Sequence, residues 1–376
     1  MKDEKVNQTI EYLNAPQPLV IGIEGGPCGG KTTAVNELAL MNSPDIVLLP
    51  EVATKKISIL SSLGKSVIDL AQSSREEYVA FQCDVLREIV SSIANARKLY
   101  EGSEKIIISD RVDIGAYVNP KEYRSILNTL DLNAAPYLSL TDKIIYLPTL
   151  AKLDPDKFKL MFKNNPSRYE ADVNQAVDTC DRNLLSIADH PELSVYASSN
   201  MEEKIEKIRA EILKPENEVE AKFIPIETFD RGVILKYLKQ RCGIFLSKIA
   251  IKQSYHSWNS QEYRLRQVTT EGGDNAFYYA VKSGEGRDKR EKRRIIDQNT
   301  YEMLRSVQST GELSKTRYRY LFDIYPGSEF TTVLSADFYT KSNLCMVEIE
   351  GFNPAYSNVV YLPGFSASEL SARDLI

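Results

Sequence analysis

The chain has 376 residues, of which 43% are hydrophobic and 26% are charged. This is the composition of a folded globular protein, and the length predicts two domains rather than one. The formal net charge of −5 argues against bulk nucleic acid as a partner, and no apolar run approaches the roughly 20 residues that a membrane helix needs.

The cysteines and histidines limit the cellular compartment and the residue types available for catalysis. The five cysteines are scattered without a CxxC pair, and the charged N-terminus lacks the apolar core of a signal peptide. Both features predict reduced thiols in a cytoplasmic protein. Because the chain has only two histidines, we expect catalysis to depend on carboxylates, lysine, arginine and metal.

The first half alternates predicted strands with predicted helices. Short apolar runs predict strands at residues 18–23, 45–49, 105–109, 143–147 and 193–197. Helical patterns cover residues 31–41, 75–97 and 201–213. This alternation predicts an α/β domain with a parallel sheet covered on both faces, which we place at residues 1–213.

A phosphate-binding loop follows the first predicted strand. Residues 25–32 read GGPCGGKT, which satisfies GxxxxGK[ST] between a strand and a helix. Glycines such as Gly25 and Gly30 let backbone N–H groups surround phosphate oxygens. In this motif Lys31 reaches the β and γ phosphates and the Thr32 hydroxyl holds Mg²⁺. The loop therefore predicts ATP or GTP as a ligand.

Acidic residues lie where two of these strands end. Glu51 follows the second strand, and Asp110 follows the third and is itself followed by Arg111. Ligands in open α/β sheets bind outside the carboxyl ends of the strands. Asp110 is therefore a candidate base toward an acceptor hydroxyl, or a water-mediated Mg²⁺ ligand, and Arg111 a candidate phosphate contact; the alternative is a turn aspartate beside a surface arginine.

Residues 18–213 resemble a known group of P-loop proteins. The P-loop, PEVAT at 50–54, FQCDVLREI at 81–89, SDR at 109–111 and NPSRYEADV at 165–173 carry the resemblance. They resemble AAA-type, nicotinamide-ribonucleotide-kinase-like NTPases. The resemblance implies a lid at 152–182 in which Arg168 contacts the γ-phosphate; the alternative is a solvated arginine.

The pattern changes near residues 214–217, which read KPEN and form the predicted linker. Beyond it, alternating patterns predict strands at 218–224, 262–268, 277–282, 290–296, 316–322, 331–340 and 344–350. Helices are predicted near 231–239 and 300–307. We expect an antiparallel α+β or barrel domain at residues 214–376.

Several of these strands carry one charged face and one apolar face. Arg264 and Arg266 alternate with apolar residues, as do Arg317 and Arg319. Such strands form either a sheet with its charged face in water or a barrel with the charges inside and helices outside. In a barrel, acid pairs would need cations between them and the bases would suit a polyphosphate. The pattern alone leaves both architectures open.

The ordered motifs of residues 216–376 resemble the CYTH family, the triphosphate tunnel metalloenzymes. They are ExExK, RLR, a strand-end lysine, KxRxR, an acid-x-Phe strand and VEIE. The resemblance implies an eight-stranded antiparallel tunnel that acts on triphosphates with Mg²⁺ or Mn²⁺. It assigns metal ligands to Glu218, Glu220, Asp337, Glu348 and Glu350. It assigns phosphate contacts to Lys222, Arg264, Arg266, Lys282, Arg317 and Arg319, and it places Glu218, Glu220 and Lys222 at the reacting centre.

Two positions depart from the family pattern. Arg293 and Ser335 stand where the fifth and seventh strands of the family often carry acids. The favoured function is nevertheless metal-dependent hydrolysis of a triphosphate, fused to a P-loop domain that binds ATP or GTP; some plant tunnel proteins have a similar pairing. An RNA 5′-triphosphate is compatible with this substrate class. The alternatives are a nucleotidyl cyclase, a small-molecule kinase, or a polyphosphate-binding module with a non-catalytic tunnel.

Overall fold

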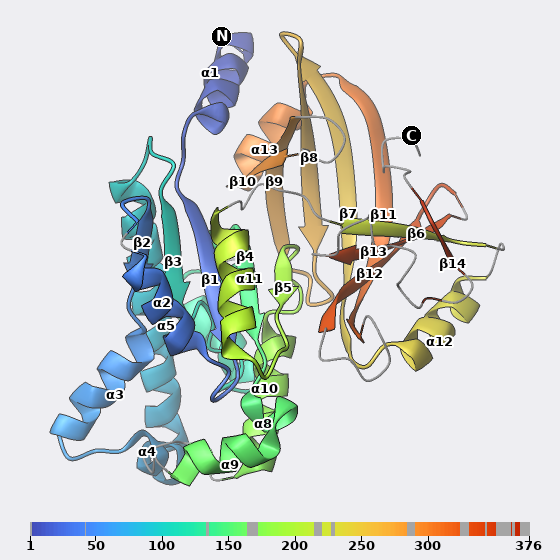
Figure 1. Cartoon of the computed structure of the whole chain (residues 1–376). Helices are drawn as coiled ribbons and strands as arrows, with labels where there is room; N and C mark the ends of the chain where they lie inside the picture. The colour runs from blue at the N-terminus through green and yellow to red at the C-terminus, as the bar shows by residue number, and fades with distance from the viewer. Residues whose placement is uncertain are drawn as a thin grey trace. The chain divides into compact units, whose positions relative to one another are not determined.

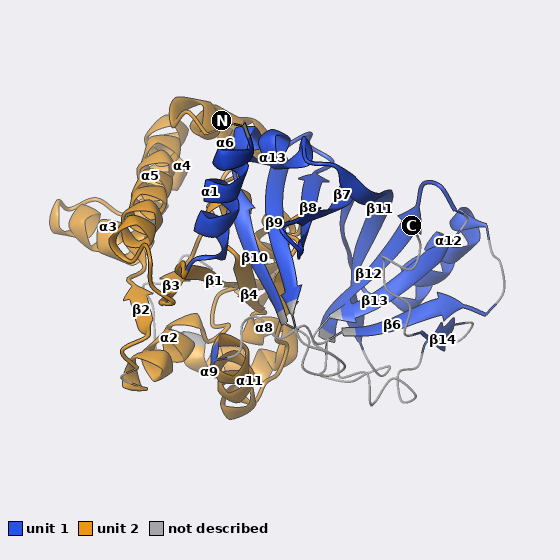
Figure 2. Ribbon diagram, turned by 90° about the horizontal axis from the view of Figure 1, so that it is seen from above, with its two compact units in different colours: residues 1–15, 213–376 blue, residues 16–212 orange. Residues whose placement is uncertain are grey.

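Residues 16–212 and residues 1–15 with 213–376 form separate units in a computed structural model of the chain (Figures 1 and 2). We call the discontinuous unit unit 1 and the inserted one unit 2, as in Figure 2. The structure describes residues 2–41, 43–132, 135–163, 172–213, 220–226, 230–283, 290–323, 331–342, 344–350, 362 and 365–368. At residues 2, 162, 163, 220, 283, 290, 331 and 350 it describes the backbone alone.

Unit 2 contains a five-stranded parallel sheet in the order β2-β3-β1-β4-β5. Its strands are β1 (Leu19–Gly25), β2 (Ile46–Leu49), β3 (Ile106–Asp110), β4 (Lys143–Leu147) and β5 (Leu193–Val195). Each strand lies where the sequence predicts one. Near-continuous apolar runs such as IIIS in β3 fit a sheet that is buried on both faces.

Helices cover both faces of this sheet, as expected. They are α2 (Lys31–Leu40), α3 (Val52–Ser62), α4 (Val67–Ser73), α5 (Arg75–Leu99), α6 (Pro120–Thr129), α7 (Pro136–Leu140), α8 (Leu150–Leu153), α9 (Pro155–Lys163), α10 (Val173–Ser186) and α11 (Met201–Leu213). On one face, Leu38 of α2 and Ile208 and Ile212 of α11 pack in a cluster with Ile23 of β1. Helix α5 contacts β3 and α10 contacts β1. The sheet is therefore a rigid platform whose strand ends can hold a site.

Unit 1 is built on a nine-stranded antiparallel sheet in the order β10-β9-β8-β7-β11-β12-β13-β6-β14. Its strands are β6 (Glu220–Pro225), β7 (Phe245–Trp258), β8 (Gln261–Thr269), β9 (Asn275–Ser283), β10 (Arg290–Ile296), β11 (Ser309–Asp323), β12 (Thr331–Tyr339), β13 (Cys345–Glu350) and β14 (Phe365–Ala367). Its helices are α1 (Lys2–Asn14), α12 (Arg231–Arg241) and α13 (Gln298–Arg305). The predicted antiparallel, barrel-like domain is confirmed.

The sheet differs from the expected eight-stranded tunnel in two respects. Strand β7, which the sequence analysis missed, lies at the centre between β8 and β11, and β14 adds a short edge strand. Among the described residues no ladder joins the edge strands β10 and β14, although the sheet bends so that β6 and β13 run across the direction of β7 and β11 (Figure 1). The described part of the sheet is thus an open, strongly bent barrel.

Two groups of helices cover one face of this sheet, which we call the outer face. Helix α12 packs through Ile234 and Leu238 on Phe322 and Leu334. Helices α1 and α13 pack on β8, β9 and β10 in a second cluster, which comprises Val6, Ile10, Leu13, Tyr263, Leu265, Phe277, Tyr279, Ile296, Tyr301 and Leu304. The apolar faces of the strands are therefore outside, under helices.

Helix α1 belongs to unit 1, although unit 2 follows it in the chain. Asn14 donates from Nδ2 to Gln261 Oε1 at 3.0 Å and accepts from Tyr279 OH at 3.0 Å. Lys292 donates to the Asn14 carbonyl at 2.9 Å. The chain changes unit at Leu213, beside the predicted linker at 214–217, and residues 1–15 group with unit 1, whereas the sequence analysis places them in the domain of residues 1–213. The apolar side of α1 accounts for this grouping, because its apolar residues are buried against the outer face of β8, β9 and β10.

None of the helices described for either unit combines the length and the apolar character needed to cross a membrane.

Candidate functional sites

The P-loop of unit 2 has the local geometry that the motif predicts. Strand β1 ends at Gly25 and helix α2 begins at Lys31. The turn is closed by a hydrogen bond of 3.0 Å from Gly29 N to Gly26 O, and Gly30 has a φ of 96°, in the left-handed region that favours glycine. Lys31 Nζ lies over the loop and donates to Gly25 O at 3.1 Å. Thr32 follows in the first turn of α2.

Asp110 lies at the carboxyl end of β3, beside the strand that leads into the P-loop. Its backbone is in register with Ile23 of β1. The side chain is buried, and Oδ1 has no hydrogen-bond partner among the described residues. Burial is the main cause that raises the pKa of Asp110 to about 6, although Lys31 opposes it. Such a carboxylate is ionised at neutral pH and basic enough to accept a proton.

Arg111 and Glu51 form an ion pair at the same sheet edge. Arg111 Nη2 lies 3.1 Å from Glu51 Oε1, and the guanidinium carbon lies 4.8 Å from the centre of the Tyr117 ring. Burial disfavours the charged form of Glu51, but Arg111 and a hydrogen bond from Thr54 hold its pKa below the usual value. The φ of 79° at Arg111 is unusual for a residue with a side chain, and such strain is concentrated at functional sites.

Glu24 is a site residue that the sequence analysis missed. It is fully buried in β1, and its Oε1 accepts hydrogen bonds from Val112 N at 2.7 Å and Asp113 N at 3.0 Å. It therefore fixes the segment that follows Asp110 and Arg111. A glutamate within an apolar strand, directly before the glycine loop, was the available signal. Arg168, the predicted γ-phosphate contact, lies outside the described residues.

In unit 1, the charged faces of the strands are buried rather than solvated. Arg264, Arg266, Lys315 and Arg317 are each less than 10% exposed, and Arg319 is fully buried. On the same strands, alternate residues contribute to the apolar clusters under the helices. Of the two architectures that the pattern leaves open, the structure has the one with charges inside. We call this face the inner face.

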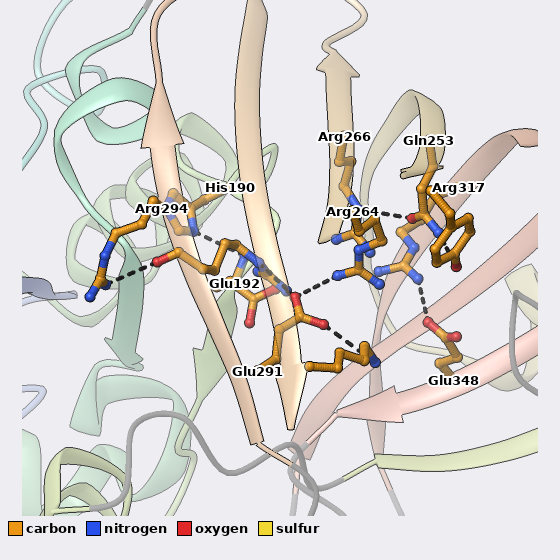
Figure 3. A network of polar contacts seen from close by, with 12 residues as sticks. His190, Glu192, Gln253, Arg264, Arg266, Glu291, Arg294, Arg317 and Glu348 are labelled. Carbon is orange, nitrogen blue, oxygen red and sulfur yellow. Dashed lines mark hydrogen bonds and ion pairs between the residues drawn. The ribbon is translucent and has the colours of Figure 1, made fainter. Parts of the chain in front are cut away.

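Two clusters of ion pairs lie on the inner face (Figure 3). In the first, Glu291 accepts from Arg264 Nη2 at 2.5 Å and from Arg293 Nη2 at 2.6 Å, and it lies 3.3 Å from Lys282 Nζ. Nearby, Arg266 Nε donates to Gln253 Oε1 at 3.3 Å. Lys282 is itself half exposed at the end of its strand.

The second cluster joins β11, β12 and β13. Arg317 donates to both oxygens of Asp337, at 2.7 and 2.8 Å, and also to Glu348. Lys315 donates to Asp337 as well. Burial disfavours ionised Asp337 and Glu348, but Arg317 and Lys315 outweigh it and lower the pKa of both carboxyl groups. Both carboxylates are therefore charged and already neutralised by bases.

Among the side chains that the structure describes, the inner face carries more bases than acids. Its basic residues are Lys222, Arg264, Arg266, Lys282, Arg293, Lys315, Arg317 and Arg319; the register places Lys222 opposite Glu348 and Lys282 opposite Glu291. Its buried carboxylates, among the described residues, are Glu291, Asp337 and Glu348. Burial and the neighbouring Arg264 lower the pKa of Arg266 to about 10, which reflects this excess of positive charge.

The predicted metal ligands are described only in part. Glu218 lies outside the described residues, and Glu220 and Glu350 are described by their backbone alone. The register places Glu350 directly opposite Glu220. Within the part of the chain that the structure describes, no group of three or more histidine, cysteine, aspartate or glutamate side chains is arranged to hold a metal ion.

Ser335 and Arg293 both lie on the inner face, at the two positions where the sequence departs from the family pattern. Ser335 is fully buried on β12, in register with Arg319 on one side and Glu348 on the other. Arg293 turns toward Glu291 and neutralises it. The sequence showed that Arg293 and Ser335 stand where the family often carries acids. It did not show that Arg293 pairs directly with Glu291.

No family model matches the chain, and no curated protein matches it. Among solved structures, the chain is similar to one described as "The crystal structure of the hypothetical protein NE1496", with 22% identity over 40% of this chain and 87% of that chain and a TM-score of 0.25.

Proposed function

We propose that unit 1 binds a triphosphate on its inner face and hydrolyses it with a divalent metal, and that unit 2 binds ATP or GTP. The observation that carries the proposal is the buried excess of arginine and lysine on the inner face. A concentration of buried basic side chains favours a polyanionic ligand, because a negative charge on this face lowers the cost of burying them. Arginine forks suit phosphate oxygens because they present paired N–H donors.

The metal would be held by glutamates on the paired strands β6 and β13. Glu348 faces Lys222 there, and the register that sets Glu350 opposite Glu220 brings like charges together, which disfavours pairing unless a cation lies between them. Asp337 fits this role less well because Arg317 already occupies both of its oxygens. A metal bound there would polarise the scissile phosphoryl group and supply an activated water.

The residues of the chain would bind and orient the substrate around that centre. Arg264, Arg266 and Arg319 would neutralise phosphate oxygens and hold the chain of phosphates along the sheet. Charge that develops on the leaving phosphate would be stabilised by these fixed guanidinium groups, which need no reorganisation during the reaction. The motif resemblance to triphosphate tunnel metalloenzymes supports the same assignment.

A phosphate-release screen tests this proposal. The full chain is assayed with tripolyphosphate, ATP, GTP and thiamine triphosphate, each with Mg²⁺ and with Mn²⁺. We expect turnover that is lost in Glu218→Ala/Glu220→Ala and retained in Glu302→Ala, an exposed glutamate on α13. Full metal-dependent turnover in the double variant would place the site elsewhere. A cyclic product from ATP would instead identify a cyclase.

A second candidate for unit 1 is a polyphosphate-binding module without turnover. The specific observation in its favour is the neutralisation of Glu291 by Arg264, Lys282 and Arg293. That carboxylate is not available to a metal. Tight triphosphate binding by calorimetry, without phosphate release under any metal, would favour this candidate.

For unit 2, we propose nucleotide binding at the P-loop and phosphoryl transfer to a hydroxyl acceptor, with Asp110 as the base. The support is the buried, basic carboxylate of Asp110 beside the loop and Lys31. Lys31→Ala should abolish or greatly weaken ATP binding, whereas Lys55→Ala, which removes an exposed lysine paired with Glu88, should not. Equal ATP affinity in Lys31→Ala and wild type would contradict the assignment.

A further inference from the structure

Helix α11 forms one wall of the P-loop. It begins at Met201, six residues after β5 ends, and its apolar side packs on the sheet through Ile208 and Ile212. Its first turn faces the loop, because a methyl group added to Gly30 would lie 2.6 Å from Met201 Sδ. Lys204 lies one turn further along and on the same side of the helix, since residues i and i+3 share a face.

Lys204 reaches the loop directly. Its Nζ donates to the carbonyl oxygen of Gly29 at 3.1 Å, although the two residues are 175 positions apart. The side chain is only 3% exposed. Within the described part of the chain, no carboxylate lies within ion-pair distance of its ammonium. Burial is the main cause that lowers the pKa of Lys204 to about 8, and Lys157 adds to the effect.

This arrangement is unusual for a lysine. A buried ammonium normally has an anionic partner, because the loss of water is otherwise not compensated. One turn further along the same helix, Lys207 shows the ordinary pattern, since it is partly exposed and lies 2.7 Å from Glu203. The positive charge of Lys204 is therefore kept beside the loop without a described carboxylate to neutralise it.

The hydrogen bond acts on a particular peptide group. The Gly29 carbonyl and the Gly30 N–H belong to the same planar peptide, so a donor on the carbonyl fixes the direction of the N–H. Gly29 has little freedom to move otherwise, because a methyl group added to it would lie 2.5 Å from the Leu147 carbonyl oxygen. A cation on the carbonyl also polarises the peptide and makes its N–H a stronger donor.

We propose that Lys204 is a positioning residue of the nucleotide site, which orients and polarises the Gly29–Gly30 peptide so that its N–H binds a phosphate of the nucleotide. The proposal rests on nucleotide binding at the P-loop. In the bound state the phosphates supply the negative charge that the described residues around Lys204 do not provide. The lysine thus contributes to affinity for phosphate without touching the base or the acceptor.

The test compares nucleotide affinities of full-length variants by calorimetry. The quantity compared is the part of ATP binding that Lys31→Ala removes. This part reports binding at the P-loop of unit 2 and excludes any ATP bound by unit 1. Lys204→Met and Lys204→Gln should weaken this binding at least about tenfold, the range expected for the loss of a charged hydrogen bond. Lys204→Arg, which keeps the charge, should retain affinity within about threefold of wild type. Lys207→Met is the matched control and should bind as wild type does.

Thermal unfolding without nucleotide separates positioning from a purely structural role. We expect the methionine and glutamine variants to unfold within a few degrees of wild type while their ATP affinity falls. If Lys204→Met does not fold, the glutamine and arginine variants carry the comparison, because they differ in charge while both can donate to Gly29. Equal ATP affinity in these two variants, or in Lys204→Met and wild type, overturns the proposal. If wild type itself shows no ATP binding that depends on Lys31, the nucleotide site is absent and the role of Lys204 fails with it, whereas Lys31-dependent binding that Lys204 variants leave unchanged overturns the role of Lys204 alone.

Discussion

Arg317 and Asp337 face each other across β11 and β12 and form a two-point ion pair, from Nε to Oδ1 at 2.7 Å and from Nη2 to Oδ2 at 2.8 Å. Arg317 also binds Glu348 on the next strand. Both carboxylates are buried, and this one guanidinium contacts both of them, while Lys315 is a second partner of Asp337. The inner face therefore depends on Arg317 for stability as well as for its proposed contact with phosphate.

Replacing Arg317 with methionine should destabilise unit 1 by about 3–5 kcal/mol, because two buried carboxylates would each lose one basic partner and Asp337 would keep Lys315. Urea unfolding of the full chain, followed by circular dichroism, measures this. Arg305→Met removes a half-exposed arginine on α13 and is the control. In Arg317→Met/Asp337→Asn the loss should be smaller than in Arg317→Met alone. If the double variant is no more stable than the single one, Arg317 does not act mainly on Asp337.

The same carboxylates should make unit 1 sensitive to acid. Neighbouring bases lower the folded-state pKa of Asp337 and Glu348 from ordinary values of 3.8 and 4.5. Their contribution to stability is therefore complete above these unfolded values and is lost as pH falls through the lower folded values. Unfolding free energy measured from pH 6 to pH 2 should fall more steeply for wild type than for Asp337→Asn. Parallel curves would show that Asp337 is not a source of acid sensitivity.

Asp110 should have the opposite pH dependence in unit 2. Burial raises the folded-state pKa of Asp110 from 3.8 to about 6. Protonated Asp110 therefore favours the folded state at pH values below the unfolded-state pKa of 3.8, relative to higher pH. This contribution to stability is lost as the pH rises through about 6. Asp110→Asn should therefore stabilise unit 2 by about 1–3 kcal/mol at pH 7.5 and much less at pH 4, while any phosphoryl transfer is lost. Chemical denaturation at the two pH values, with Asp45→Asn as an exposed control, provides the comparison. A variant less stable than wild type at pH 7.5 would mean that ionised Asp110 is stabilising.

Helix α1 should be required for the stability of unit 1 and not of unit 2. Ile10 is buried against the outer face of the sheet, so Ile10→Ala should cost about 2–4 kcal/mol in unit 1. ATP binding at the P-loop should be unchanged. Residues 214–376 alone, which the sequence predicts to fold, should lack this cover and unfold at lower temperature than the same segment joined to residues 1–15. Equal melting temperatures for these two proteins would mean that α1 is dispensable.

Local sequence determined most of unit 2. Its five strands are short apolar runs separated by helical patterns, and both signals depend on neighbouring residues alone. The P-loop is likewise a contiguous motif, so the placement of Gly25, Lys31 and Thr32 between β1 and α2 follows from eight consecutive residues. The sequence analysis did not predict the helices α3, α4, α6, α7, α8, α9 and α10 of this unit.

The alternation of charged and apolar residues in the second half had two physical solutions. Tertiary structure chose between them, because α1, α12 and α13 cover the apolar faces and leave Arg317 and Arg319 on the inner face. Local alternation specifies which residues share a face, but it cannot specify which face a distant helix will cover. The placement of α1 shows this most clearly, since it packs on strands that follow it by more than 240 residues.

Contacts between residues far apart in the chain could also not be predicted from the sequence. Glu24, Lys204 and Gln253 carry no motif, and each acquires its partner only when separate elements meet. The chain itself determined the residue types, the strand faces and the phosphate-binding loop. Tertiary structure decided which charges are buried and which are neutralised, because burial and pairing depend on the packing of elements that are far apart in the chain.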